Sequence, residues 1–309
     1  MMTWVKFGAA ALVLVLIVAG AWLWTPDLTR QEAERRQGGA PSAFVEVLGL
    51  RLHLRDTGPR DAPPILLLHG FGSSLHTWDD WARLLETDRR VLRIDLPGFG
   101  LTGPDPSGDY SDQRFVLLVE ELLDRLGIAR IDILGSSMGG RLAWRFAADR
   151  PARVRRLVLM APDGFASAGF RYGVPTPVPL AMRALPYTLP GFLLRGGLAP
   201  AYADAAALTD AVLARYRDMM LAPGVRHAII ARMEQHILEP PEPFLRRITA
   251  PVLLLWGESD RMIPAPHAAD YARELPDSRT VLLPALGHVP MEEDPARSLA
   301  PVREFLATP

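Results

Sequence analysis

The chain has 309 residues, 49% of them hydrophobic and 22% charged, and a formal net charge of −1. Such a chain can bury a large core in one domain with an insertion, but without a long basic stretch it lacks the clustered Lys and Arg of a nucleic-acid surface. It has no cysteine, which excludes a disulfide framework, a zinc-thiolate site and a cysteine nucleophile.

An apolar run stands near the start of the chain. It covers residues 7–24, an uncharged stretch of 18 residues, which is the lower limit for a helix that spans a bilayer. Tryptophans flank it at both ends, as interfacial aromatic residues do. We predict that residues 1–24 form a single-pass membrane anchor. A secretory signal peptide, cleaved near the small residues 19–21, is the alternative.

The charges around this run favour opposite orientations. Lys6 precedes the run, whereas Arg30, Arg35 and Arg36 follow it, and the count of basic residues favours a cytoplasmic domain. The export-like start of the chain favours the other side. Of the two we expect a periplasmic or outward-facing domain, with secretion after signal cleavage as the alternative.

Residues 25–42 are polar and end in a Gly-Gly-Ala-Pro-Ser stretch, which predicts a linker. After it, residues 44–47 and 50–54 alternate apolar and polar around Gly49, which predicts a hairpin. Short continuous apolar runs follow, typical of strands that crossover helices bury on both faces. These runs are 65–68, 91–94, 131–134, 157–160, 252–256 and 280–283, and the helical candidates are 78–85, 111–126, 139–149 and 295–306.

The alternation of short apolar runs with helical segments stops between residue 164 and about residue 243. Two stretches there, 203–221 and 225–238, have the apolar spacing of helices. We therefore predict an α/β fold with a mostly parallel, eight-stranded sheet. Its core would comprise residues 43–164 and 244–309, and a helical cap would be inserted at 165–243.

The segment GSSMG at 135–139 follows a predicted strand and precedes a helix. This is the context of a nucleophile elbow, in which a sharp strand-to-helix turn presents a serine in a strained conformation. Only Ser137 has glycine both two residues before and two residues after it, whereas Ser136 does not. Ser137 is the predicted nucleophile, and a chance match in an ordinary turn is the alternative.

A serine hydroxyl needs a base and an orienting carboxylate. His288 follows the last apolar run and Asp260 the one before it, so both would reach the same sheet edge as Ser137, in the order Ser, Asp, His. Asp163, after the strand 157–160, is the alternative acid, and Glu258 is less well placed. For the other histidines we expect structural or surface roles: His69 bracing its loop, His267 exposed at a helix start, and His227 and His236 in the cap.

Acyl transfer also needs donors for the developing oxyanion. The backbone amide of Met138 is one candidate, and that of Phe71, in the segment HGFGSS at 69–74, is the other; a plain glycine turn is the alternative for that segment. Residues 98–103 match the dinucleotide pattern GxGxxG, but prolines follow where a helix should begin. We expect no cofactor, and no metal, because paired ligand spacing is absent.

Five motifs together resemble the lid-bearing α/β-hydrolase superfamily over residues 43–306: HGFGSS at 69–74, DLPGFG at 95–100, GSSMGG at 135–140, WGESDRMIP at 256–264 and GHVPMEEDP at 287–295. With the N-terminal run, the chain resembles membrane-anchored monoacylglycerol lipases and related carboxylesterases. The resemblance implies a triad of Ser137, Asp260 and His288 and an oxyanion hole of Phe71 and Met138. Dehalogenases and epoxide hydrolases of this superfamily have aspartate at the elbow, so Ser137 excludes them.

We therefore predict a serine hydrolase that cleaves small-molecule carboxylic esters, including lipid-derived esters such as monoacylglycerols. Carbon-carbon bond hydrolysis, acyl transfer or a cofactor-free haloperoxidase reaction on the same triad is the alternative, and a membrane-tethered scaffold without turnover is a third. The expected partners are the substrate and the membrane, with no nucleic acid; the oligomeric state stays open. Apolar cap residues suggest either an acyl or aromatic substrate or a cap core: Phe165, Phe170, Tyr187, Phe192, Met219 and Met220.

Overall fold

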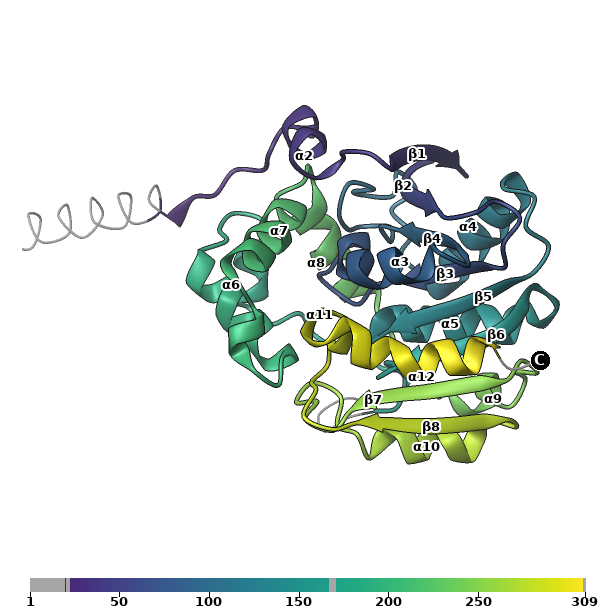
Figure 1. Ribbon diagram of the computed structural model, residues 1–309. Helices are drawn as coiled ribbons and strands as arrows, with labels where there is room; N and C mark the ends of the chain where they lie inside the picture. The colour runs from purple at the N-terminus through teal and green to yellow at the C-terminus, as the bar shows by residue number, and fades with distance from the viewer. Residues whose placement is uncertain (1–19, 21–22, 167–170, 308–309) are drawn as a thin grey trace, which may run out of the picture.

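The computed structural model describes residues 20, 23–166 and 171–307 (Figure 1). Its centre is one eight-stranded sheet in the order β1-β2-β4-β3-β5-β6-β7-β8. The strands β1 and β2 pair antiparallel, β2 also runs antiparallel to β4, and all later pairings are parallel. The predicted eight-stranded, mostly parallel sheet is confirmed.

Each of the short apolar runs predicted from residue 65 onwards lies in a strand. The strands are β1 (Ser42–Val47), β2 (Leu50–Thr57), β3 (Pro64–Leu68), β4 (Arg90–Ile94), β5 (Ile131–Ser136), β6 (Val154–Met160), β7 (Val252–Gly257) and β8 (Ser278–Leu283). Central strands such as β5 and β7 are buried along their whole length, whereas β8 at the edge is half exposed. Burial on both faces explains why the central strands are continuously apolar.

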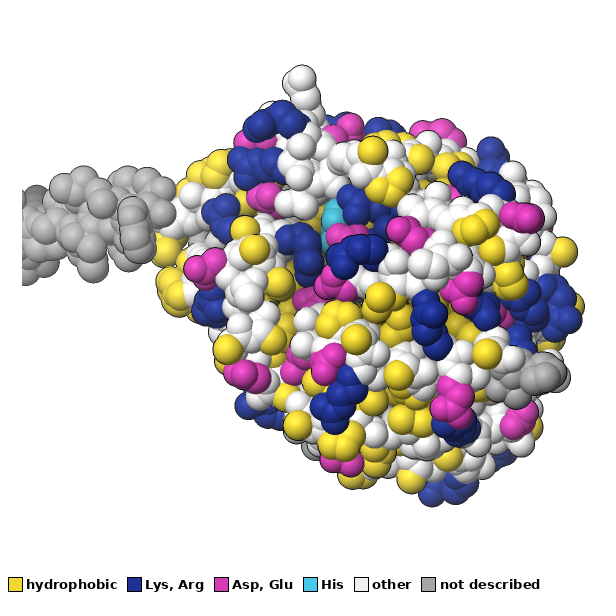
Figure 2. Space-filling model, viewed as in Figure 1, with side chains coloured by type: hydrophobic (Ala, Val, Ile, Leu, Met, Phe, Trp, Pro, Cys, Tyr) yellow, Lys and Arg dark blue, Asp and Glu magenta, His cyan; other side chains and the backbone are white. Residues whose placement is uncertain are grey.

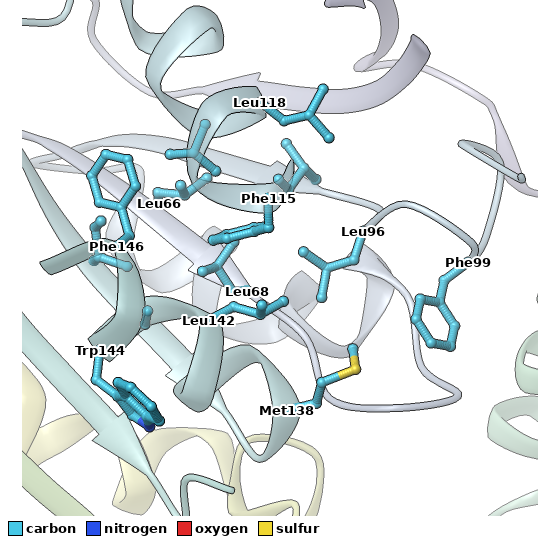
Figure 3. Packing of buried hydrophobic residues seen from close by; sticks show 14 of the residues in the cluster. Leu66, Leu68, Leu96, Phe99, Phe115, Leu118, Met138, Leu142, Trp144 and Phe146 are labelled. Carbon is cyan, nitrogen blue, oxygen red and sulfur yellow. The ribbon is translucent and has the colours of Figure 1, made fainter. Parts of the chain in front are cut away.

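Helices cover both faces of the sheet, and successive strand residues serve opposite layers. Leu66 and Leu68 pack towards the helices α4 (Asp112–Arg125) and α5 (Met138–Asp149), as Figure 3 shows. Ile65 and Leu67 pack on the other face. That face is covered by α3 (Asp79–Leu85) and α12 (Pro295–Ala307), while α10 (His267–Glu274) lies with α4 and α5. The four helices predicted for the core therefore all form.

The cap is inserted between β6 and β7. Its helical segments are η3 (Met182–Ala184), α6 (Gly191–Leu198), η4 (Ala199–Ala201), η5 (Ala205–Ala207), α7 (Asp210–Met220), α8 (Val225–Gln235) and α9 (Glu242–Leu245). The predicted helix 203–221 begins later, at residue 210, because the hydroxyl of Thr209 accepts the amide of Val212 and caps α7. Gly224, with φ 75°, makes the turn into α8.

Residues 25–42 do not form the predicted linker. Residues Arg30–Gln37 fold into helix α2, which Thr29 caps, and α2 lies beside α7 (Figure 1). Arg36 Nη1 and Gln37 Nε2 both donate to the Asp218 carboxylate of α7, at 2.9 and 3.0 Å. The linker prediction is wrong because these polar side chains find partners far along the chain, which local composition does not reveal.

The predicted anchor, residues 1–24, lies almost entirely outside the described residues. Within the part of the chain that the structure describes, no helix is both long and apolar enough to span a bilayer.

Charged side chains of both signs are scattered over the surface. On the face shown in Figure 2, the Lys and Arg side chains alternate with Asp and Glu rather than gather into one basic patch. A nucleic-acid surface needs such a patch. The distribution on this face agrees with the balanced charge of the sequence.

A buried carboxylate organises the loops above β4. Asp95 accepts hydrogen bonds from the amides of Leu75 and Leu101, each at 2.7 Å, and contacts His53 Nδ1 at 2.7 Å. Burial alone would raise the pKa of Asp95, but His53 holds this pKa well below its usual range. The GxGxxG segment thus wraps a side chain: a Cβ on Gly100 would lie 2.2 Å from Asp95 Oδ2. The next helix, α4, begins only at Asp112.

Acidification should destabilise the fold through His76, which is buried below α2. Burial lowers the pKa of His76 from 6.5 to about 4. The unfolded chain therefore takes up this proton first, and stability falls as the pH drops from 6.5 to about 4, by about 3 kcal/mol for this one group. Urea unfolding of wild type and His76→Asn at several pH values measures this. We expect a shallower decline for the variant; equal declines would contradict the assignment.

Candidate active site

Ser137 occupies the turn between β5 and α5 with φ 54° and ψ −121°. A side-chain-bearing residue at positive φ is strained by roughly 1–3 kcal/mol, so its surroundings must impose the conformation. The glycines two residues away on either side permit this: a Cβ on Gly135 would lie 2.1 Å from Gly139 O, and one on Gly139 would lie 2.4 Å from Leu68 O. The turn therefore has the geometry expected of a nucleophile elbow.

The loop 69–74 passes directly against this serine. A Cβ on Gly70 would lie 3.2 Å from Ser137 Cβ. His69 fixes the loop as predicted: its Nδ1 donates to Gly70 O at 2.8 Å, and its Nε2 accepts the amide of Leu96 at 2.9 Å. Burial lowers the pKa of His69, which keeps the ring neutral as this pair of bonds requires.

Two backbone amides near Ser137 are free to donate. Met138 is the first residue of α5, where a helix leaves its N–H groups without intrahelical partners. The amides of Met138 and Phe71 make no hydrogen bond to any other described residue. Both residues also line the pocket that contains Ser137. The arrangement can supply donors to an oxyanion.

His288 and Asp260 form a buried pair. His288 Nδ1 lies 2.7 Å from Asp260 Oδ2, and the two residues are 5% and 7% exposed. Asp260 Oδ1 accepts the amides of Met262 and Ile263 at 2.8 and 2.9 Å, which fixes the carboxylate. The amide of His288 donates to Ala201 O in the cap at 2.7 Å. Asp260 therefore holds the imidazole at Nδ1 and Ala201 holds the backbone of its loop, which leaves Nε2 for other chemistry.

The alternative acid, Asp163, is engaged elsewhere. Its Oδ2 accepts from Arg141 Nε at 3.2 Å, and its amide donates to Ser137 O at 3.0 Å. Glu258 is exposed. Among the described residues, the carboxylate in contact with His288 is that of Asp260. Within the same residues, the side-chain hydrogen bond of His288 goes to Asp260, and none joins it to Ser137 Oγ.

The remaining histidines and cap residues take varied places. His267 starts α10, as predicted, but is half-buried rather than exposed; His227 lies near Tyr187, and His236 lines the pocket. Of the six apolar cap residues, Phe165 lines the pocket, Met219 is buried in the core, Met220 packs against it, and Tyr187 and Phe192 are exposed. Phe170 lies outside the described residues. Phe165 is therefore placed to contact a molecule in the pocket, whereas Met219 and Met220 belong to the packing of the cap and core.

The pocket over Ser137 lies between core and cap and has a volume of about 780 Å³. Its apolar wall comprises Phe71, Phe165, Pro177, Pro179, Met233, Ile237, Leu238, Met262 and Ile263. A charged end is formed by Asp112, Arg141, Asp163 and Arg232. A cavity of this size and lining suits a mostly apolar molecule with a few polar groups.

Comparison with known proteins identifies the family. Residues 63–295 match the family described as alpha/beta hydrolase fold. The chain belongs to that family. Ser137 follows the carboxyl end of β5, and Asp260 lies in the loop after the carboxyl end of β7.

Relatives within the α/β-hydrolase family act on different bonds. A 2-hydroxy-6-oxononadienedioate/2-hydroxy-6-oxononatrienedioate hydrolase of Cupriavidus pinatubonensis is 30% identical over 249 residues, which is 77% of this chain and 84% of the relative. A crystal structure of a membrane phospholipase A, described as a bacterial virulence factor, is 28% identical with a TM-score of 0.74, covering 97% of this chain and 98% of that one. The enol-lactonase of Burkholderia xenovorans LB400 is 26% identical with a TM-score of 0.73, covering 86% and 100%.

The two candidate acids can be separated by mutation. Asp260→Asn should slow labelling of Ser137 by a fluorophosphonate by a factor on the order of 10³ to 10⁴, because the amide no longer orients the imidazole or stabilises its charge. Asp163→Asn is the matched control and should keep most of the labelling rate. Rates are measured by gel fluorescence on folded variants. A larger loss for Asp163→Asn would contradict the assignment of Asp260.

Proposed function

We propose that this protein is a serine hydrolase that cleaves carboxylic esters through an acyl-enzyme on Ser137. The observation that carries the proposal is the strained backbone of Ser137, held beside the partner-free amides of Met138 and Phe71. A buried His288–Asp260 pair supports it as base and orienting acid. Strain of this kind persists where the surroundings impose it, and it gathers at reaction centres.

The proposed reaction has two steps. His288 Nε2 takes the proton of Ser137 as Oγ attacks the ester carbonyl, and the amides of Phe71 and Met138 bind the resulting oxyanion. The intermediate collapses, the alcohol leaves with the proton from His288, and an acyl-enzyme remains. His288 then removes a proton from water as the water attacks the acyl carbonyl, and it returns this proton to Ser137 Oγ when the acyl–Oγ bond breaks and the acid leaves. Asp260 keeps Nδ1–H directed away from Ser137 throughout.

The pocket favours esters with a sizeable apolar acyl group, such as lipid-derived esters. Its volume of about 780 Å³ and its apolar wall support this class. The similarity to a membrane phospholipase A supports it further, because that match covers 97% of the chain and so extends beyond the family core at 63–295. Monoacylglycerols and monoacyl phospholipids are the proposed substrates.

An exposed apolar patch supports the proposal that the protein works at a membrane. We propose that such a patch is formed by Trp24, Leu180, Tyr187, Phe192 and Leu193, each more than half exposed. Trp24 and Tyr187 lie with ring centroids 6.1 Å apart, so the patch adjoins the end of the apolar N-terminal run. Figure 2 shows apolar side chains at this end of the molecule. Such patches mark interaction surfaces. We propose a membrane-anchored domain on the periplasmic or outer side.

Carbon-carbon bond hydrolysis is the second candidate. It is favoured by the relative from Cupriavidus pinatubonensis, which is named as a hydrolase of a dienedioate. Such a substrate carries acid groups, and the pocket offers the basic side chain of Arg232 to receive one. Loss of colour from a 2-hydroxy-6-oxo-dienoate would reveal this activity.

Labelling with a fluorophosphonate probe tests the enzyme directly. Wild type should be labelled and Ser137→Ala should not, because the probe reacts only with an activated serine. Hydrolysis of p-nitrophenyl esters and monoacylglycerols of graded chain length, beside the dienoate, then ranks the substrates. Folded wild-type protein that resists the probe would overturn the serine hydrolase proposal. Turnover of the dienoate alone would favour carbon-carbon bond hydrolysis over ester hydrolysis.

The apolar patch makes a separate prediction. Replacing both Phe192 and Leu193 by serine should lower hydrolysis of monoacylglycerol in vesicles several-fold, because less apolar surface is available to enter the bilayer. Hydrolysis of a water-soluble p-nitrophenyl ester is the internal control and should change little, since neither residue lines the pocket. Unchanged activity on vesicles would remove the proposed role of the patch.

A further inference from the structure

Arg232 is a buried cation at the charged end of the pocket. It belongs to the cap helix α8, is 6% exposed, and lines the same pocket as Ser137. Its Nε lies 3.2 Å from the sulfur of Met138, and its guanidinium carbon is 5.6 Å from the centre of the Phe99 ring. Figure 3 shows the side chain of Met138 extending towards the loop of Phe99. The guanidinium is therefore placed above the first residue of α5.

The cap and core do not neutralise this charge directly. The acceptors of Arg232 among the described residues are the Met138 sulfur and, at 3.5 Å, Pro97 O; a thioether and a distant carbonyl are weak partners. No carboxylate in residues 23–166 or 171–307 forms an ion pair with it. The nearby carboxylates of Asp112 and Asp163 are both bound by Arg141.

Arg232 nevertheless stays charged at neutral pH. Burial, and then the neighbouring Arg141, lower the pKa of Arg232 to about 10. A guanidinium carries five N–H donors, and most of those on Arg232 have no partner in the part of the chain described here. Buried charges in proteins are normally paired. A cation left unpaired beside a substrate pocket is suited to an anion that the ligand brings.

The position of Arg232 restricts where that anion sits on the substrate. Met138 supplies one amide to the proposed oxyanion hole, while its side chain touches the guanidinium. A negatively charged group bound by Arg232 is thus separated from the reacting carbonyl by little more than the length of one side chain. In a monoacyl glycerol phosphate, the phosphate follows the ester within a few bonds, which fits this spacing.

We propose that Arg232 forms an anion subsite that binds the phosphate or carboxylate group of an ester substrate next to the scissile bond. The subsite deepens the proposed ester hydrolysis and rests on it. It makes the enzyme prefer anionic monoacyl esters over neutral monoacylglycerols with the same acyl chain. A guanidinium suits this task because its planar donors bind two oxygens of one group.

Matched substrates test the subsite. The ratio of kcat/KM for a 1-acylglycerol 3-phosphate to that for the 1-acylglycerol of equal chain length is measured for wild type, Arg232→Gln and Arg232→Lys. Loss of a charge-assisted bond should lower the ratio roughly 10- to 100-fold in Arg232→Gln, and Lys should restore part of it. A hemisuccinate monoester of the same lipid distinguishes carboxylate from phosphate. Arg183→Gln, an exposed cap arginine paired with Glu234, is the control.

The outcomes separate this proposal from the one on which it rests. Labelling of Arg232→Gln by the fluorophosphonate shows that the variant is folded and that Ser137 is active. Given labelling, an unchanged ratio, or an equal fall with both substrates, overturns the anion subsite and leaves the serine hydrolase intact. If Arg232→Gln fails to fold, the same ratio is measured for Arg232→Lys, in which a single ammonium group replaces the planar guanidinium. A ratio equal to that of wild type then overturns bidentate binding of the anion by Arg232. An unlabelled wild type would overturn the serine hydrolase itself.

Discussion

The backbone of Ser137 is the constraint on which the rest of the site depends. A residue with a side chain sits at φ 54°, and it can do so only because Gly135 and Gly139 let β5, α5 and the end of β3 approach one another. The amide of Ser137 also donates to Met160 O on β6. Three neighbouring parallel strands thus hold the turn, and the strain is offset by the cooperative stability of the sheet.

The sequence predicted the sheet for a physical reason. Strands buried on both faces must be apolar, so runs such as 252–256 can be predicted as strands without knowledge of their neighbours in the sheet. Carboxyl ends of parallel strands share one edge, which predicts that Asp260 and His288 lie near the elbow, and the structure brings these two residues into contact with each other. The choice between Asp260 and Asp163 could not be made from strand order alone. It required the contact between Asp260 and His288, and the engagement of Asp163 by Arg141.

Long-range pairing of charges was the part that the sequence hid. Helix α2 is almost wholly polar, and its partner Asp218 lies 182 residues after Arg36. Arg232 was missed likewise, because an arginine on a cap helix is ordinarily assigned to solvent. In both cases the decisive fact is what lies opposite the side chain after folding. Composition and periodicity describe only the helix or strand to which the side chain belongs, not the residues that it meets after folding.

The segment before the sheet, around residues 25–28, is bound to the cap by several hydrogen bonds and an ion pair, unlike a flexible tether. The amides of Thr25 and Leu28 donate to Tyr187 O and Leu221 O, and Asp27 binds the buried Arg226. Force applied at the N-terminus would therefore reach the roof of the pocket before it reached the sheet. A pull on this segment would therefore act on the cap first. Shortening the chain to its catalytic core would remove these contacts as well, and the cap would then move over Ser137 with fewer restraints.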